Sequence, residues 1–376
     1  MRDGAHPAPA SLLRAGAVLT VDLDALCANY RLLRARVAPA ACAAVVKADA
    51  YGLGAGPVAG ALFDAGCRDF FVAHLDEGIR LRPDLPEAAR IFVLHGAMPG
   101  TEDEFLEHGL VPVLNSLHQV QAWRALAGGA GRPLAAALQI DTGMHRMGLS
   151  LDELETLVAD DAPLRGIDLQ LVMSHLACAD EPGHPHNAHQ LERFRSLSAR
   201  LPAGPASLAN SSGSFLDPGF RFDLARAGAA LYGIAPTAGA PNPLHQVVRL
   251  QARVVQVRRI EAGAQVGYGC RYTAPAPRFV ATAAMGYADG WPRQLSGRTV
   301  GVFQGTALPQ IGTVSMDSIT LDVSALPPGR LQPGDLVDLI GPGQTVDDIA
   351  ALAGTIGYEI LTGLGPRLAR RYLRSD

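Results

Sequence analysis

The sequence predicts a two-domain α/β protein, in which a (β/α)8 barrel of the TIM type is followed by a mainly β domain. Eight short apolar runs that alternate with helix-like segments over about 200 residues predict the barrel. After about Pro243 the alternation gives way to β-type patterns separated by Gly, Pro and Asp, which predicts the second domain. A doubly wound sheet would alternate similarly, but the number of strands favours the barrel.

The expected elements follow in chain order. Residues 16–22 have the pattern of a strand, and residues 24–37 that of a helix, because Leu26, Tyr30 and Leu33 recur at helical spacing. The eight strand-like runs lie at 43–47, 69–73, 90–94, 110–114, 134–140, 169–175, 206–210 and 222–227. Helix-like segments lie between most of them, for example at 56–65, 102–108, 117–126, 151–159 and 187–201.

The second domain begins with a long alternating segment at 247–260, the pattern of a half-buried strand. Later strand-like runs lie at 279–285, 299–303, 318–323 and 335–340, and a helical pattern returns at 346–353. The stretch from Pro236 to Pro243 has the Pro- and Gly-rich composition of an interdomain segment. We therefore expect a barrel domain at 16–240 and a β domain at 241–376, with residues 1–15 packing against the β domain.

Composition excludes several classes of function. A net charge of −4 and a pI of about 6.3 give no electrostatic reason to expect binding to nucleic acid or an anionic membrane. No apolar run is long enough to span a membrane, and residues 1–17 lack the apolar core of a signal peptide. Five scattered cysteines without a Cys-x-x-Cys pair predict reduced thiols, no metal centre and a cytoplasmic protein.

The most informative stretch runs from Ala44 to Gly54. Its apolar first part ends at Lys47, and glycines and Tyr51 follow, so the chain is expected to turn sharply just after a buried strand. A lysine at the mouth of such a strand favours its neutral amine, the form that attacks carbonyl groups to give Schiff bases. From this stretch alone, a lysine that extends its amine into solvent is the alternative interpretation.

Other polar residues stand at the carboxyl ends of later strands, where barrel enzymes place their active sites. Arg146 follows the fifth strand, His175 ends the sixth, Asn210 and Ser211 end the seventh, and Arg226 lies in the eighth. A buried histidine is by itself more often structural, and a lone arginine can belong to a loop ion pair. The convergence on one rim favours a functional site.

A phosphate site is predicted between the last two loops of the barrel. Ser211 offers a hydroxyl, and Gly228 and Ala229 can bring backbone N–H groups close to an anion. The stretch Ser211-Ser212-Gly213 also fits an ordinary helix N-cap. A phosphate site together with a lysine at a strand end points to pyridoxal phosphate, which needs both an amine partner and an anion site.

These motifs resemble the alanine racemase family over nearly the whole chain. The resemblance is carried by the stretch around Lys47, by Gly286-Tyr287-Ala288-Asp289-Gly290, by Ser315-Met316-Asp317 and by Gly357-Tyr358-Glu359. It implies a homodimeric enzyme that uses pyridoxal 5′-phosphate to interconvert L- and D-alanine and so supplies D-alanine for peptidoglycan. It also implies active sites shared between the two subunits.

The resemblance assigns roles to individual residues. Lys47 would bond covalently to the cofactor, and Tyr268 of the other subunit would be the acid/base group on the opposite face. Arg226 would face the pyridine nitrogen, with His175 linked to it. The cofactor-binding set implied is Lys47, Tyr51, His175, Asn210, Ser211, Arg226, Gly228, Ala229 and Tyr358. The substrate-binding set implied is Arg146, Tyr287, Met316 and Asp317.

Gln139 is a departure from the family pattern, which usually has a carbamylated lysine two residues before Asp141. An arginine held away from water without a counter-charge is costly. An amide N–H beside a guanidinium can hold an anion, so we expect a chloride between Gln139 and Arg146.

Two competing hypotheses remain at this stage. One is another enzyme of the same pyridoxal-phosphate fold type, either a racemase of wider specificity or a decarboxylase, although Tyr268, Tyr287 and Met316 argue against the decarboxylase. The other is not an enzyme but a single-barrel pyridoxal-phosphate carrier. Such carriers resemble only the barrel half, whereas this chain continues into a β domain.

Overall fold

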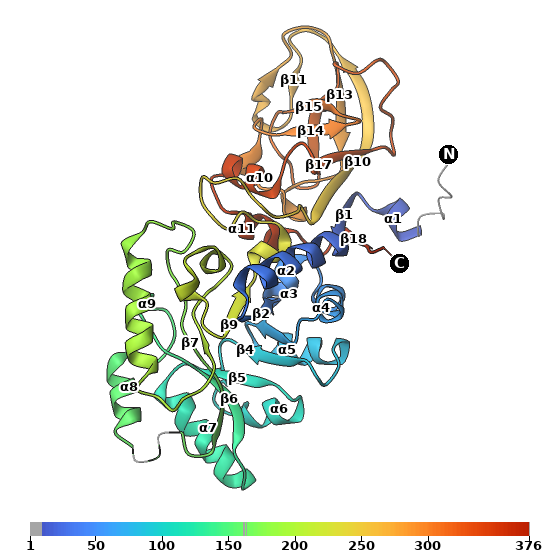
Figure 1. Cartoon of the computed structure of the whole chain (residues 1–376). Coiled ribbons are helices and arrows are strands. Elements are labelled where there is room, and N and C mark those ends of the chain that lie inside the picture. The colour runs from blue at the N-terminus through green and yellow to red at the C-terminus, as the bar shows by residue number, and fades with distance from the viewer. Residues whose placement is uncertain (1–9, 161, 163, 376) are drawn as a thin grey trace. The chain divides into compact units, whose positions relative to one another are not determined.

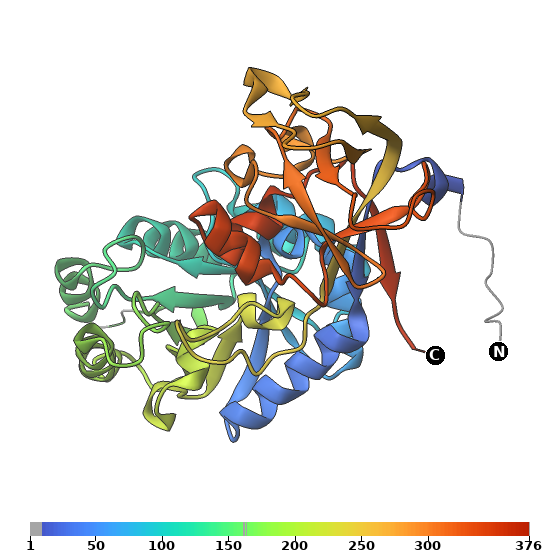
Figure 2. The ribbon, with the colours of Figure 1, turned by 90° about the horizontal axis from the view of Figure 1, so that it is seen from above.

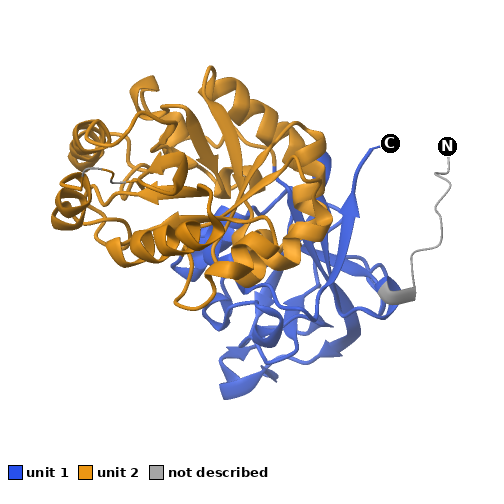
Figure 3. Cartoon of the chain, turned by 90° about the horizontal axis from the view of Figure 1, so that it is seen from below, with its two compact units in different colours: residues 1–24, 246–376 blue, residues 25–245 orange. Residues whose placement is uncertain are grey.

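The computed structural model describes residues 10–160, 162 and 164–375. The described residues divide into two compact units: unit 2 lies within residues 25–245, and unit 1 combines residues 10–24 with residues 246–375 (Figure 3). Each unit has its own eight-stranded sheet. The predicted fold class, a barrel followed by a mainly β domain, is confirmed.

Unit 2 is the predicted barrel (Figure 1). Its strands are β2 (Ala41–Val45), β3 (Asp69–Val72), β4 (Arg90–Val93), β5 (Val111–Leu114), β6 (Leu134–Gln139), β7 (Ile167–Met173), β8 (Ala206–Ser207) and β9 (Leu224–Ala227). They pair in parallel in the order β8-β7-β6-β5-β4-β3-β2-β9. The Arg226 N–H donates to the Ala209 carbonyl over 2.9 Å, which joins the two ends of this sheet. Every residue of β3, β5 and β9 is buried, as expected for strands covered on both faces.

Helices cover the outside of these strands (Figures 1 and 2). They are α2 (Leu23–Val37), α4 (Ala55–Asp64), α5 (Leu75–Leu81), α6 (Glu102–Glu107), α7 (Leu117–Ala130), α8 (Leu151–Val158) and α9 (Pro185–Ser198). The sequence did not predict α5, because Gly78 and several charged residues interrupt its apolar pattern. Among the described residues, no helix is long and apolar enough to cross a membrane.

Unit 1 is the mainly β unit. Its larger sheet contains β1 (Ala17–Asp22), β10 (Val248–Ile260), β13 (Arg278–Ala283), β14 (Val300–Phe303), β15 (Thr306–Ile311), β16 (Ile319–Asp322), β17 (Leu336–Ile340) and β18 (Ala369–Leu373). The strand order is β13-β16-β15-β14-β17-β10-β1-β18, and β13 also pairs with β10, which closes six strands into a ring. A small ribbon, β11 (Gln265–Val266) with β12 (Tyr272–Thr273), and the helices α1 (Ala10–Arg14), α10 (Val346–Ala353) and α11 (Gly357–Gly363) complete the unit.

The observed division differs from the expected one at the first strand. We placed residues 16–22 in the barrel domain, but β1 pairs antiparallel with β10 and parallel with β18, so it belongs to unit 1. The carbonyls of Leu12 and Ala15 accept hydrogen bonds from the Arg253 guanidinium, so this part of the N-terminal segment contacts the same unit. Residues 1–9 lie outside the described residues.

Candidate active site

The polar residues predicted at the barrel rim lie close together in unit 2. Lys47 follows β2, Arg146 lies in the loop after β6, His175 follows β7 and Arg226 lies in β9. Burial lowers the pKa of His175 to about 3, and the charges of Arg226, Arg146 and Lys47 add to that shift. His175 is therefore neutral near pH 7, among three basic side chains.

Lys47 has the environment expected of a nucleophilic amine. It is only partly exposed, at the end of a strand whose last four residues are buried. Burial lowers the pKa of its amine, the nearby charge of Arg146 lowers it further, and the carboxylate of Glu77 partly opposes them. Lys47 is also the only lysine in the 376 residues, which by itself singles it out as the one amine side chain available to bond an aldehyde.

A left-handed turn, α3 (Lys47–Gly52), follows the strand end. Ala48, Asp49, Ala50 and Tyr51 all have φ between 53° and 57°. This conformation costs about 1–2 kcal/mol per residue outside glycine, so surrounding contacts must hold it. Tyr51 is buried with its ring centroid 4.8 Å from that of Tyr232. The sharp turn expected from the glycines is thus made largely by other residues.

The residues predicted for phosphate binding are adjacent. The Ser211 hydroxyl accepts hydrogen bonds from the backbone N–H groups of Gly228, at 2.8 Å, and Ala230, at 3.2 Å. A side chain at Gly228 would place its Cβ 2.6 Å from the Tyr51 hydroxyl oxygen, so any larger residue there would have to displace that hydroxyl. The Ser211 and Tyr51 hydroxyl groups therefore both lie next to the backbone at Gly228, a grouping that suits a phosphate.

The N-cap interpretation of Ser211 is wrong. Ser211 makes no side-chain cap to the short helix that follows it. Instead, the Asn210 side-chain oxygen accepts the Gly213 N–H at 2.9 Å, which leaves the Ser211 hydroxyl directed to the backbone at Gly228 and Ala230.

Arg226 and His175 form a buried pair. Arg226 is 3% exposed, and its Nη2 donates to the Ser174 carbonyl at 2.6 Å and to His175 Nδ1 at 3.4 Å. Because a guanidinium only donates, Nδ1 is the acceptor, and the proton of the neutral ring sits on Nε2. Burial lowers the pKa of Arg226 to about 10, so it stays charged near pH 7. Nη1 donates to the Ser207 carbonyl at 3.1 Å, a contact that nothing in the sequence signalled.

Gln139 is buried, but Arg146 differs from the expectation because its side chain is exposed. Gln139 is 4% exposed, and its Nε2 donates to the Met147 carbonyl at 3.2 Å. Arg146, which we expected to be held away from water, is exposed in the single chain. The loop that carries it lies at the surface, where Asp141 Oδ1 accepts backbone N–H groups including that of Gly143 at 2.9 Å. The burial cost on which the chloride expectation rested is therefore absent from the isolated chain.

The remaining predicted residues lie in unit 1. The motifs of Tyr287 and Met316 are adjacent there, because the Tyr287 N–H donates to the Ser315 carbonyl at 3.1 Å. Asp317 pairs with Arg367 at 2.7 Å, a partner that the sequence did not indicate. Unit 1 also exposes several predicted side chains: Tyr268 is 72%, Met316 53%, Tyr287 44% and Tyr358 36% exposed.

The residues of unit 2 fit pyridoxal phosphate. The cofactor needs an amine to bond its aldehyde, an anion site for its phosphate and a partner for its ring nitrogen. Unit 2 offers Lys47 for the first, the Ser211–Gly228 contact for the second and Arg226 for the third. Within the described ranges, no group of three His, Cys, Asp or Glu residues is placed to hold a metal ion.

Comparison with known proteins gives consistent matches over both units. The family model described as alanine racemase, N-terminal domain, matches residues 21–236, and the model described as alanine racemase, C-terminal domain, matches residues 247–372. A protein of Mesorhizobium japonicum named "Alanine racemase, catabolic" is 56% identical over 365 residues, which cover 97% of this chain and 95% of that protein. An alanine racemase of Rhodospirillum rubrum is 53% identical over 360 residues, covering 96% of each.

A solved structure is similar as well. The crystal structure of alanine racemase from Bartonella henselae with covalently bound pyridoxal phosphate has a TM-score of 0.91 and 43% sequence identity to this chain. The match covers 96% of this chain and 100% of that one.

Proposed function

This chain belongs to the alanine racemase family and interconverts L- and D-alanine with pyridoxal 5′-phosphate, and we propose that Lys47 and Tyr268 are its two bases. The observation that carries the proposal is the rim of unit 2, where a lysine with a lowered pKa, the Ser211–Gly228 contact and a buried arginine occur together. The β-domain match over 247–372 argues against a single-barrel carrier.

The cofactor, when bound, supplies an aldehyde that bonds to amines and a conjugated ring that accepts the electron pair left by a departing α-proton. Lys47 would hold the cofactor and would take or return the α-proton of the substrate at Nζ. Tyr268 does the same at its phenolic oxygen from the opposite face. Inversion needs both groups, because one base can return a proton only to the face from which it took it.

Other residues bind and tune the cofactor in this proposal. Tyr51, Asn210, Ser211, Gly228 and Ala229 hold or shape the phosphate site. The family resemblance adds Tyr358 to this set. Arg226 faces the ring nitrogen, and because a guanidinium keeps its protons it leaves that nitrogen unprotonated. His175 accepts a hydrogen bond from Arg226 and fixes its orientation. Arg146, Met316 and Asp317 bind the substrate carboxylate side, and Tyr287 narrows the entrance.

We further propose a cytoplasmic homodimer that supplies D-alanine for peptidoglycan. Tyr268 and Met316 are more than half exposed in the single chain, and a partner subunit that completes the site would cover them. Free thiols at Cys27, Cys42, Cys67, Cys178 and Cys270 suit a reducing compartment.

The substrate assignment is tested by incubating the protein with single L-amino acids and measuring the ratio of enantiomers. L-alanine should approach equal amounts of both enantiomers faster than any other amino acid, because Tyr287 in this proposal narrows the entrance and so disfavours a longer side chain. Faster racemisation of serine or of a larger amino acid would favour the racemase of wider specificity. Carbon dioxide release would indicate a decarboxylase.

We also propose that a small anion binds between Gln139 and Arg146. One proton of Gln139 Nε2 is used by the Met147 carbonyl, and the second is a donor for an anion that Arg146 attracts. Bromide should give an anomalous signal there in a crystal. Activity should not respond to bicarbonate removal, whereas a Gln139→Lys variant should acquire that response. Water alone at this position would contradict the proposal.

A further inference from the structure

We propose that Glu77 is a positioning residue for Lys47, which it places by clamping the left-handed turn to the neighbouring strand end. The proposal rests on the assignment of Lys47 as the cofactor lysine. Glu77 lies in the first turn of α5, and its two carboxylate oxygens accept hydrogen bonds from two different segments. Oε1 accepts the Ala48 N–H at 2.7 Å, and Oε2 accepts the Ala73 N–H at 2.7 Å and the His74 N–H at 3.1 Å.

The Ala48 contact reaches the residue directly after Lys47. Ala48 begins the run of four residues with positive φ, so its N–H direction is set by the strained backbone. The Ala73 contact fixes the other oxygen to the end of β3, which pairs with β2. Glu77 thereby joins the strand end that carries Lys47 to its neighbour on the rim.

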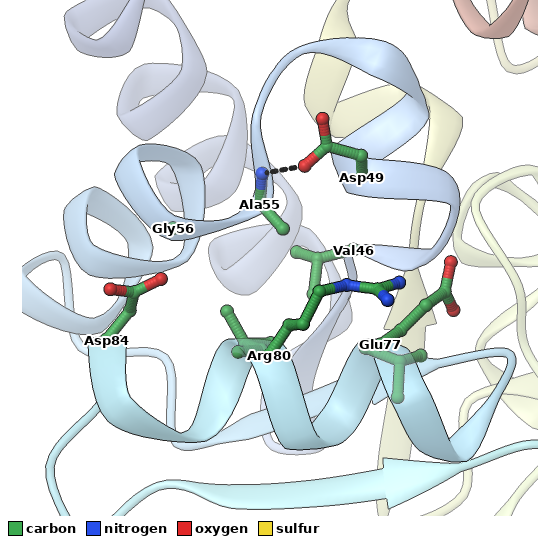
Figure 4. A pocket seen from close by; sticks show the side chains of 9 residues that line it. Val46, Asp49, Ala55, Gly56, Glu77, Arg80 and Asp84 are labelled. Carbon is green, nitrogen blue, oxygen red and sulfur yellow. Dashed lines mark hydrogen bonds between the residues drawn. The ribbon is translucent and has the colours of Figure 1, made fainter.

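The turn is not closely packed on every side. A cavity of about 170 Å³ lies there, lined by residues that include Val46, Asp49, Glu77 and Arg80 (Figure 4). Figure 4 shows Glu77 and Arg80 rising from α5, with Asp49 across the cavity from them. Asp49 fixes the far end of the turn, because its Oδ1 accepts the Ala55 N–H at 2.7 Å. The carboxylates of Glu77 and Asp49 therefore hold the left-handed turn on the side where the cavity lies.

The carboxylate also acts on Lys47 through its charge. Glu77 raises the pKa of the Lys47 amine, against the larger lowering by burial and by Arg146. Removing the charge and shortening the side chain are thus separable changes. Glu77→Gln removes the charge and places an amide NH2 where an acceptor is needed, whereas Glu77→Asp keeps the charge but is one methylene shorter.

Glu153 provides a matched control. It is also half-buried in the first turn of its helix, α8, and its Oε2 accepts the Ser150 N–H at 3.0 Å. Its Oε1 reaches a neighbouring segment, the Leu117 N–H, at 3.0 Å. Glu153 differs from Glu77 in its partners, and it contributes no charge effect to the pKa of Lys47.

The experiment measures two properties that do not depend on turnover. The first is the pH at which labelling of Lys47 by an amine-reactive reagent is half-maximal in cofactor-free protein. Peptide mapping distinguishes label on Lys47 from label on the N-terminal amine. The second is the dissociation constant of pyridoxal phosphate, with borohydride reduction to locate the covalent link.

Glu77→Gln should move the labelling midpoint to lower pH and weaken cofactor binding about 10- to 100-fold, the range for a lost charged hydrogen bond. Glu77→Asp should weaken binding without moving the midpoint, and Glu153→Gln should change neither.

The outcomes separate this proposal from the assignment of Lys47. If both Glu77 variants bind the cofactor as tightly as Glu153→Gln and label at the same pH, Glu77 only caps α5 and the proposal is overturned. If borohydride places the cofactor of the unaltered protein away from Lys47, the cofactor-lysine assignment fails instead. Should Glu77→Gln not fold, the binding measured for Glu77→Asp still decides the matter.

Discussion

Replacing Lys47 with alanine should abolish the covalent link to pyridoxal phosphate and lower racemisation by at least about 10³-fold, because one residue supplies both the cofactor bond and a base. The protein should lose its visible cofactor band, and borohydride should no longer fix cofactor to the chain. Lys47 is the only lysine in the sequence, so no other lysine can take its place as the covalent partner of the cofactor.

Lys47→Arg is the control for charge. It restores a cation at the strand end but cannot form the covalent bond, so it should be as inactive as the alanine variant. A reducible link that persists in Lys47→Ala, or activity that Lys47→Arg recovers, would contradict the role given to this amine.

Replacing Tyr268 with phenylalanine should lower racemisation by about 10²- to 10⁴-fold, the usual contribution of a positioned acid or base. Cofactor binding should be unchanged, because Lys47, Ser211 and Arg226 are untouched. In deuterated water the variant should still exchange the α-hydrogen of one alanine enantiomer, on the face served by Lys47. Tyr272→Phe, a change to a nearby tyrosine in the same unit, should retain activity. Rapid inversion by Tyr268→Phe would show that another group is the second base.

The barrel and its rim were largely predictable because their signals are local. A parallel strand buried on both faces appears as a continuous apolar run, and the polar residue that ends the run then lies at the rim. Lys47 and His175 were placed in this way and Arg226 was placed within the eighth strand, and the structure brings the three together. Motifs in unit 1 were likewise recognisable, and those of Tyr287 and Met316 are adjacent.

What could not be predicted depends on distant contacts. The pattern of residues 17–22 shows a strand, but its partners β10 and β18 are more than two hundred residues away, so its sheet was assigned wrongly. β18 was missed because its sequence, Ala-Arg-Arg-Tyr-Leu, has little apolar character. The left-handed turn was missed because Ala48 and Ala50 have no intrinsic preference for positive φ.

Two features of the site, the contact of Glu77 with Ala48 and the exposure of Arg146, could not be predicted because they depend on how distant segments pack. Nothing near Glu77 in the sequence shows that its carboxylate reaches Ala48, which lies on the other side of a helix and a strand in the chain. The exposure of Arg146 was misjudged because a residue's place in a motif does not fix how deeply its loop is buried.

The most direct test of a shared two-base site is to mix Lys47→Ala with Tyr268→Phe under conditions of subunit exchange. Each variant alone should be nearly inactive. In a mixed dimer with shared sites, one site carries both substitutions and the other carries neither, so an equal mixture should regain about one quarter of the unaltered activity. If no activity returns although exchange is demonstrated independently, each site takes Lys47 and Tyr268 from the same chain or does not use both, and the account is contradicted.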